Sequence, residues 1–208
     1  MQYLGACVYS DGRADSEISR KLGAARADFQ QLAAVWKHAN VPVKDKLQYF
    51  HSLIISRLIY GLASMWLVVG QRRRLDGFYA RCLRSILRVP HSFISRVSSA
   101  QVFRKAGVPK FSDQLLQRQM ILLGKVARSP ADSPLRRDTF LPGTILPQLG
   151  RFVGRVGRPR QDWTRELLKI GTDKLGAAKF DRMLSDTASG AQLRWKSEWQ
   201  RVLPSRVQ

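Results

Sequence analysis

Arginine side chains recur between residues 72 and 89 at spacings that gather several of them on one side of a helix. At about 100° per residue, a stripe roughly 80° wide contains Arg74, Arg81, Arg84 and Arg88. A guanidinium group stays charged and presents a planar set of N–H donors, which suits it to bind phosphate oxygens. Asp76 is the only acid of this segment, so the helix offers these cations few partners of its own. We interpret the stripe as a phosphate-binding face; the alternative is a basic face that only meets solvent.

Other basic residues extend the candidate nucleic-acid site beyond this helix. Arg72 and Arg73 lie directly before the stripe. A second helix, expected over about 112–128, places on one face Arg118, Lys125 and Arg128. Glycines alternate with arginines further along, so the backbone can lie close to a groove while each guanidinium reaches a phosphate or a base edge. The arginines of that segment are Arg151, Arg155, Arg158 and Arg160.

The sequence contains no pattern typical of a metal or catalytic site. Cys7 and Cys82 are the only cysteines and lie far apart in the sequence, and only three histidines, His38, His51 and His91, could join them. This favours reduced thiols in an intracellular protein over a disulfide framework or a zinc site. Scattered histidines do not indicate a catalytic triad either. We therefore expect no metal and no cofactor.

The net charge favours a polyanionic partner. Among 208 residues, 36 Lys and Arg stand against 15 Asp and Glu, a net charge of +21. Residues 70–160 hold 19 of the basic and 4 of the acidic residues, a net +15 in under half the chain. Such clustering is typical of a nucleic-acid-binding surface, with an anionic membrane as the second possibility and charge for solubility alone as the third. The N-terminal residues lack the basic start and apolar run of a signal peptide, so we expect a nuclear or cytoplasmic protein that is not secreted.

Hydrophobic periodicity predicts the helices that must position these side chains. A first helix, about 15–36, carries apolar residues three and four apart: Ile18, Leu22, Ala25, Phe29, Leu32 and Val35. A second, from Pro42 to about Val69, is apolar almost all round over residues 53–69. That run is short for a membrane span and contains Arg57, so we expect a buried central helix and no stable membrane insertion.

The arginine-bearing helix, about 72–89, has an apolar side formed by Leu75, Phe78, Tyr79, Cys82 and Ile86. Shorter helices are expected over about 98–106, 162–170 and 173–184. Trp195 and Trp199 are expected in a core, with base stacking as the alternative. The prediction is a mainly α-helical bundle, residues 1–128, with a short N-terminal β-strand over 3–9. A basic Pro/Gly/Arg linker, residues 129–160, joins it to a small C-terminal helical segment, residues 161–208.

Several segments, in order, resemble the region that follows the polymerase palm in non-LTR (LINE-type) retrotransposon reverse transcriptases. The similar segments are Tyr3-Leu4-Gly5 with Asp11-Gly12, Glu17 to Arg26, Leu58-Ile59-Tyr60-Gly61 with Trp66, Leu75 to Leu87, and Gly157-Arg158-Pro159-Arg160 with Trp163. In the same order, they resemble the family's primer-grip strand, its first thumb helix, its "LLYG…W" helix, its "L…F…RCLR.IL" helix and its "GRPR..W" element. The resemblance covers residues 3 to about 165 and does not include 170–208.

The resemblance implies a helical thumb and connector that grip a template–primer duplex of RNA or DNA through its backbone. It also implies a catalytically incomplete fragment, because the family's polymerase needs paired palm carboxylates to hold two metal ions. This chain has no Tyr-x-Asp-Asp turn and no adjacent acidic pair. Polymerase activity would then require a partner chain that carries the palm. The alternatives are a non-functional remnant of a mobile element, and a peripheral membrane protein that uses the 53–69 segment with Arg72–Arg74.

Overall fold

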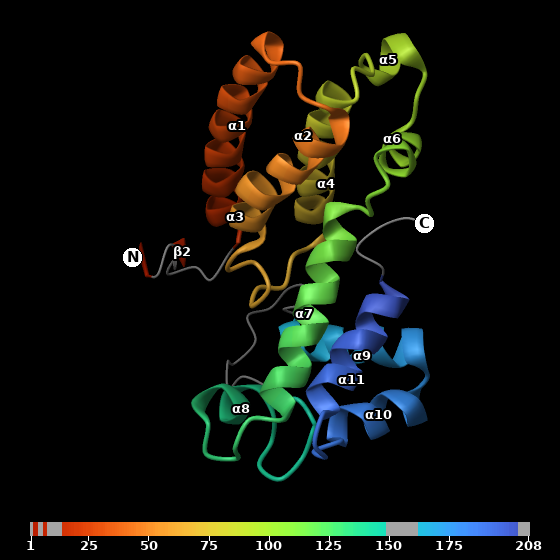
Figure 1. The fold of residues 1–208 in the computed structure, drawn as a ribbon. Helices are drawn as coiled ribbons and strands as arrows, with labels where there is room; N and C mark the ends of the chain where they lie inside the picture. The colour runs from red at the N-terminus through yellow and green to blue at the C-terminus, as the bar shows by residue number, and fades with distance from the viewer. Residues whose placement is uncertain (1, 4–5, 8–13, 149–161, 204–208) are drawn as a thin grey trace. The chain divides into compact units, whose positions relative to one another are not determined.

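The computed structural model describes residues 2–3, 6–7, 14–148 and 162–203, and it is mainly α-helical (Figure 1). This confirms the predicted helical bundle. The chain forms two compact units, and the division between them falls between Leu115 and Leu116, inside α7 (Phe111–Ala127). The sequence pattern places the end of the first domain later, at residue 128. Residues up to 115 are called unit 1, and residues 116–203 are called unit 2.

Near the N-terminus, two very short strands replace the single strand predicted over 3–9. β1 (Gln2–Tyr3) pairs antiparallel with β2 (Ala6–Cys7), with Gln2 opposite Cys7 and Tyr3 opposite Ala6. The other residues of the predicted strand lie outside the described residues.

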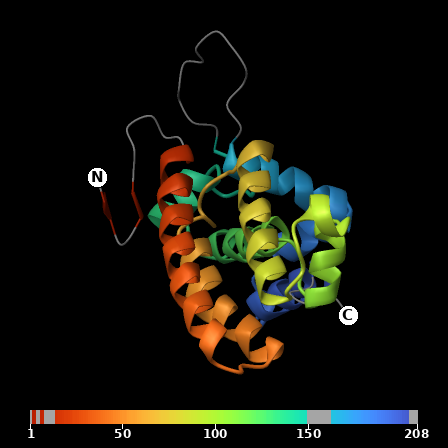
Figure 2. The same ribbon diagram turned by 90° about the horizontal axis from the view of Figure 1, so that it is seen from above.

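The first predicted helix is confirmed as α1 (Asp15–His38). Acidic residues occupy its first turn and basic residues its last, as the helix dipole favours. Ile18, Leu22 and Ala25 are buried as expected, whereas Val35, which the apolar stripe places on the same face, is 60% exposed. α1 lies beside α4 (Val69–Ile86), and both contact the helical stretch that follows α1 in the chain (Figure 2).

That stretch ends at Ile59, well before the predicted end at Val69. It consists of α2 (Val43–Tyr49), a π-helical turn η1 (Phe50–Ile55) and α3 (Ser56–Ile59). Lys21 of α1 donates from Nζ to the Tyr60 carbonyl at 2.6 Å, satisfying an acceptor at the end of the helix. Gly61 then takes a φ of +75°, a left-handed conformation that suits glycine. A continuous helix to Val69 was therefore the wrong prediction.

Burial along residues 53–69 is uneven. Ile54, Leu58 and Leu62 are at most 2% exposed, but Leu53 is 50% exposed and Val69 64%. The expected buried character is thus confirmed for the inward side only. Among the helices of the described residues, none is both long and apolar enough to cross a membrane.

The core of unit 1 is centred on Tyr79 of α4, which is fully buried. Its ring stacks on Phe50 at 5.8 Å and on Phe103 at 5.7 Å between centroids. Its hydroxyl lies 2.8 Å from Nε2 of His51 and accepts a hydrogen bond from Gln114 at 3.2 Å. Burial raises the pKa of the Tyr79 phenol well above its usual value, so the neutral hydroxyl persists over the physiological range.

Cys82 lies one turn further along α4 and is also buried. Burial raises the pKa of its thiol to about 12, against an ordinary value of 9.0, while nearby Arg81 and Arg26 oppose that rise. Desolvation of the thiolate outweighs the attraction of both cations. The thiol is therefore protonated and a poor nucleophile at neutral pH.

Unit 2 contains the rest of α7, α8 (Pro134–Thr139), α9 (Trp163–Leu175), α10 (Ala177–Ser185) and α11 (Ala191–Val202). Trp195 and Trp199 of α11 are fully buried, which confirms their core assignment over base stacking. The indole Nε1 of Trp195 donates to the Met120 carbonyl at 2.6 Å. Its ring covers Gly124 so closely that a Cβ added at Gly124 would lie less than 3.0 Å from ring atoms.

Part of the predicted linker 129–160 is folded. α8 begins at Pro134, and Phe140 is buried at 1% exposure while forming a β-bridge with Pro147. Within the segment predicted as a linker, residues 134–147 thus contain a short helix and a β-bridge. Residues 149–160 of the predicted linker lie outside the described residues.

Candidate nucleic-acid interface

The outer face of α4 carries exposed arginines separated by small residues. After the exposed first residue Val69, the exposed positions of α4 are Gly70, Arg73, Arg74, Gly77, Arg81 and Ser85. Within the described part of the chain, the side chain of Arg73 makes no hydrogen bond or ion pair. Arg81 makes one long bond, 3.4 Å, to the Gly77 carbonyl of its own helix. These two guanidinium groups are therefore available to an external anion.

Two further members of the predicted stripe are exposed, with different surroundings. Arg88 lies just past the end of α4, and its guanidinium has no hydrogen-bonding or ionic partner among the described residues. Arg74 donates to the Ser19 hydroxyl at 3.0 Å and lies 3.7 Å from the carboxylate of Asp15. Since both partners belong to α1 and both charges are about half exposed, this ion pair is weak and exchangeable.

Arg84 does not belong to the exposed stripe. It is only 7% exposed, and its guanidinium donates to the carbonyls of Pro90, at 3.1 Å, and Val97. The loop between those residues folds back over this position of α4 and covers it. A buried guanidinium requires such acceptors. Arg84 therefore holds the loop in place, and its assignment to the phosphate-binding face is corrected.

Arg72 is likewise engaged within the protein. Its Nε donates to the Leu67 carbonyl at 2.9 Å, and its guanidinium lies 4.2 Å from the ring centre of Trp66. A cation held over an indole face and a carbonyl is well placed to fix the chain before α4. Arg72 therefore contributes to the start of α4 more than to its outer face.

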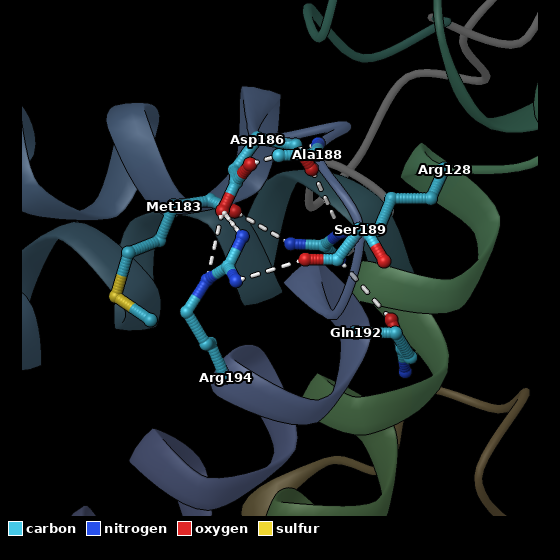
Figure 3. A network of polar contacts seen from close by, with 7 residues as sticks. All are labelled: Arg128, Met183, Asp186, Ala188, Ser189, Gln192 and Arg194. Atoms are coloured by element: carbon cyan, nitrogen blue, oxygen red, sulfur yellow. Dashed lines mark hydrogen bonds and ion pairs between the residues drawn. The ribbon is translucent and has the colours of Figure 1, made fainter.

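In unit 2, three basic residues on α7 or just after it were predicted to contact nucleic acid, and they also divide into exposed side chains and one engaged within the protein. Arg118 and Lys125 are exposed. Arg128 is half-buried and donates to the carbonyls of Gly124 at 2.6 Å and Asp186 at 3.0 Å, and to that of Met183 (Figure 3). Its assignment as a nucleic-acid contact is corrected, because these acceptors occupy its donors.

The network around Arg128 continues through Asp186 (Figure 3). Arg194 donates from Nη2 to the Asp186 carboxylate at 2.7 Å, and the backbone N–H of Ala188 donates to it at 3.0 Å. The hydrogen bond from Arg194, followed by that from Ala188, holds the pKa of Asp186 below its usual value. The carboxylate therefore remains charged in the neutral range and serves the fold of unit 2.

The linker arginines Arg151, Arg155, Arg158 and Arg160 lie outside the described residues, and their role stays a prediction.

No group of three or more potential metal ligands occurs among the residues that the structure describes. Comparison of the chain with protein-family models, with curated proteins and with solved structures gave no match.

Asp76 has a role that the sequence pattern did not indicate. Its carboxylate accepts hydrogen bonds from the backbone N–H of Ser112 at 2.8 Å and from the Ser112 hydroxyl at 2.9 Å. Ser112 lies in the first turn of α7, where unpaired N–H groups and the helix dipole favour an anion. The one acid of α4 is thus turned toward α7, which leaves the outer arginines without an acidic neighbour on their own helix.

Proposed function

We propose that this chain binds duplex nucleic acid with little sequence preference, through contacts between exposed arginines and backbone phosphates. The residues that carry the proposal are Arg73, Arg81 and Arg88, with Arg74 as an exchangeable fourth. The observation that carries most weight is the lack of compensating acid on the outer face of α4. A solvated helix face usually mixes charges of both signs, because ion pairs three or four residues apart stabilise it.

The small residues of that face support the proposal. A Cβ added at Gly70 or Gly77 would meet no atom of the described residues within 4 Å, so the space beside the helix backbone is open at these two positions as far as the structure describes the chain. A phosphate backbone can then approach α4 closely while the arginines on either side reach its oxygens. Contacts of this kind fix the position of a duplex but carry no sequence information.

We also propose the origin that the sequence resemblance implies, the thumb and connector of a non-LTR reverse transcriptase. The support is the order of the similar segments along the chain, with the "RCLR" segment lying on α4 beside the proposed contacts. In this proposal the chain acts by binding and carries no polymerase chemistry of its own, since it lacks paired palm carboxylates.

The salt dependence of duplex binding tests the proposal. Three neutralised phosphates alone predict a slope of about −2.7 for log affinity against log salt on B-form DNA. We expect a slope at least that steep, with similar affinities for duplexes of unrelated sequence. Fluorescence anisotropy with end-labelled duplexes over a series of salt concentrations measures both. Binding that is absent at low salt, or insensitive to salt, would contradict the proposal.

A further inference from the structure

The loop that follows α4 presents an aromatic side chain to solvent. α5 (Ser92–Ser95) forms its tip and lies beyond the C-terminal end of α4 within unit 1 (Figure 1). Phe93 is 74% exposed and the neighbouring Ile94 is 64% exposed. Large apolar side chains exposed this far need a partner to become buried, and two adjacent ones at a loop tip form a contact point.

The loop is held in place at its base by Arg84. The guanidinium of this buried side chain joins the carbonyls at both ends of the loop, Pro90 and Val97. The Ser95 hydroxyl adds bonds to the Pro90 and His91 carbonyls, each at 3.1 Å. A mobile loop would lose conformational entropy when a ligand fixed it, whereas this one is already ordered.

Two residues flanking the tip adopt an uncommon backbone conformation. Arg88 and Arg96 have φ of +54° and +55°, the left-handed region that residues other than glycine rarely occupy. Such conformations persist only where surrounding contacts impose them, and they are found preferentially at functional sites. They also bring an arginine to each end of the loop, and both arginines are exposed.

The ring of Phe93 is itself supported from one side. The ring of His91 lies nearly parallel to it, with 10° between the planes and 5.8 Å between the centroids. An oriented, exposed ring is suited to stack on another flat ring.

The charge around the tip indicates which ring-bearing partner fits. Residues 77–112 contain no acid and seven basic residues: Arg81, Arg84, Arg88, Arg96, Arg104, Lys105 and Lys110. Nucleic acids combine a negative backbone with flat bases, and proteins that hold unpaired strands pair cationic grooves with stacking aromatic side chains. An uncharged apolar protein surface would gain nothing from these cations.

We infer that Phe93 stacks on an unpaired nucleobase where a duplex meets a single strand, while Arg88 and Arg96 contact the adjoining phosphates. This inference rests on the proposed function, because the duplex part would lie along α4. Since the loop continues directly from the C-terminal end of α4, a duplex on the outer face of α4 would meet the loop at its end. The chain should therefore prefer a duplex with an unpaired extension over a blunt one.

The test compares a blunt duplex with the same duplex bearing a short unpaired extension, in which 2-aminopurine replaces the first unpaired base. Stacking of one base changes affinity by about tenfold, so we expect about that preference for the extended duplex and quenching of the probe on binding. Phe93→Ala should abolish both and leave blunt-duplex affinity unchanged. Phe93→Trp should retain both, and Phe93→Leu, which keeps apolar surface without a ring, should behave like Phe93→Ala. Leu193→Ala, at an equally exposed apolar position of α11, is the matched control and should have no effect.

The possible failures are distinguishable. If the wild type binds both duplexes in a salt-dependent way but equally well, the inference is wrong and the proposed function stands. The inference is also wrong if Phe93→Leu keeps the preference, since apolar contact would then suffice. Loss of binding to phosphatidylserine vesicles in Phe93→Ala, without any change in the preference, would assign the tip to a membrane instead. If the wild type binds neither duplex at low salt, the proposed function itself fails.

Discussion

Replacing Arg73, Arg81 and Arg88 with glutamine should flatten the salt dependence of duplex binding by up to about 2.7 units of slope. Each of these exposed side chains can neutralise one phosphate and release its condensed counterion, and glutamine can do neither. At physiological salt this corresponds to an affinity loss of about a hundredfold. The loss should be similar for unrelated sequences, because the contacts are with the backbone. Anisotropy titrations of wild type and variant across a salt series measure it.

A matched variant separates the position of the charges from their number. Lys44, Arg165 and Lys169 are also exposed and lie on α2 and α9, so changing them to glutamine removes the same net charge from other surfaces. We expect that variant to keep nearly the wild-type slope. Far-ultraviolet circular dichroism should be unchanged in both, since the substituted side chains are outside the core. Equal slopes in the two variants, with both folds intact, would show that α4 has no special role.

Gly124→Ala should lower the free energy of unfolding by about 2–3 kcal/mol, a large part of the stability of a small domain. The added methyl group would collide with the indole of Trp195, which is fully buried and tied to the Met120 carbonyl. Because this is a rigid ring in a close-packed core, it cannot yield without breaking that bond or moving α11. Urea unfolding followed by circular dichroism at 222 nm gives the change.

Gly23→Ala is the control, because it makes the same substitution where nothing obstructs it. Gly23 lies on the exposed side of α1, and a Cβ added there would meet no atom within 4 Å among the described residues. Alanine favours the helix over glycine by about 1 kcal/mol, so this variant should be more stable than the wild type. Opposite signs for the two variants are expected. A neutral or stabilising Gly124→Ala would mean that the ring of Trp195 does not occupy the described position.

Sequence periodicity located the helices whose apolar residues form a clear stripe. α1 and α6 (Ser99–Ala106) begin and end close to the predicted residues. The ends of α6 carry local signals, the Ser98 cap and Gly107. The helix predicted over 42–69 had no such stripe in its second half, so its end could not be located by periodicity. A side chain distant in sequence, Lys21, donates hydrogen bonds to the carbonyls of Arg57 and Tyr60 at that end.

For the candidate site, a helical wheel gave the direction of each arginine but not what lies above it. Arg84 and Arg128 point away from the apolar side of their helices, yet Arg84 is covered by the loop that follows α4, and Arg128 donates to a segment distant in the sequence. The exposure of Phe93 could not be predicted either, because it depends on how the loop around it is held. Nothing in a short apolar pair between serines indicates that the loop holds it in solvent; that follows only from the contacts of Arg84.

The buried, protonated thiol of Cys82 can be used to measure how often unit 1 opens transiently. A reagent that attacks thiolates reaches Cys82 only in molecules whose unit 1 has transiently opened, because burial both shields the sulfur and raises its pKa to about 12. In a Cys7→Ser background, the rate of labelling would therefore count opening events under native conditions. If a bound duplex stabilises α4, the labelling rate of Cys82 should fall as duplex is added. That fall measures binding without a label on the nucleic acid.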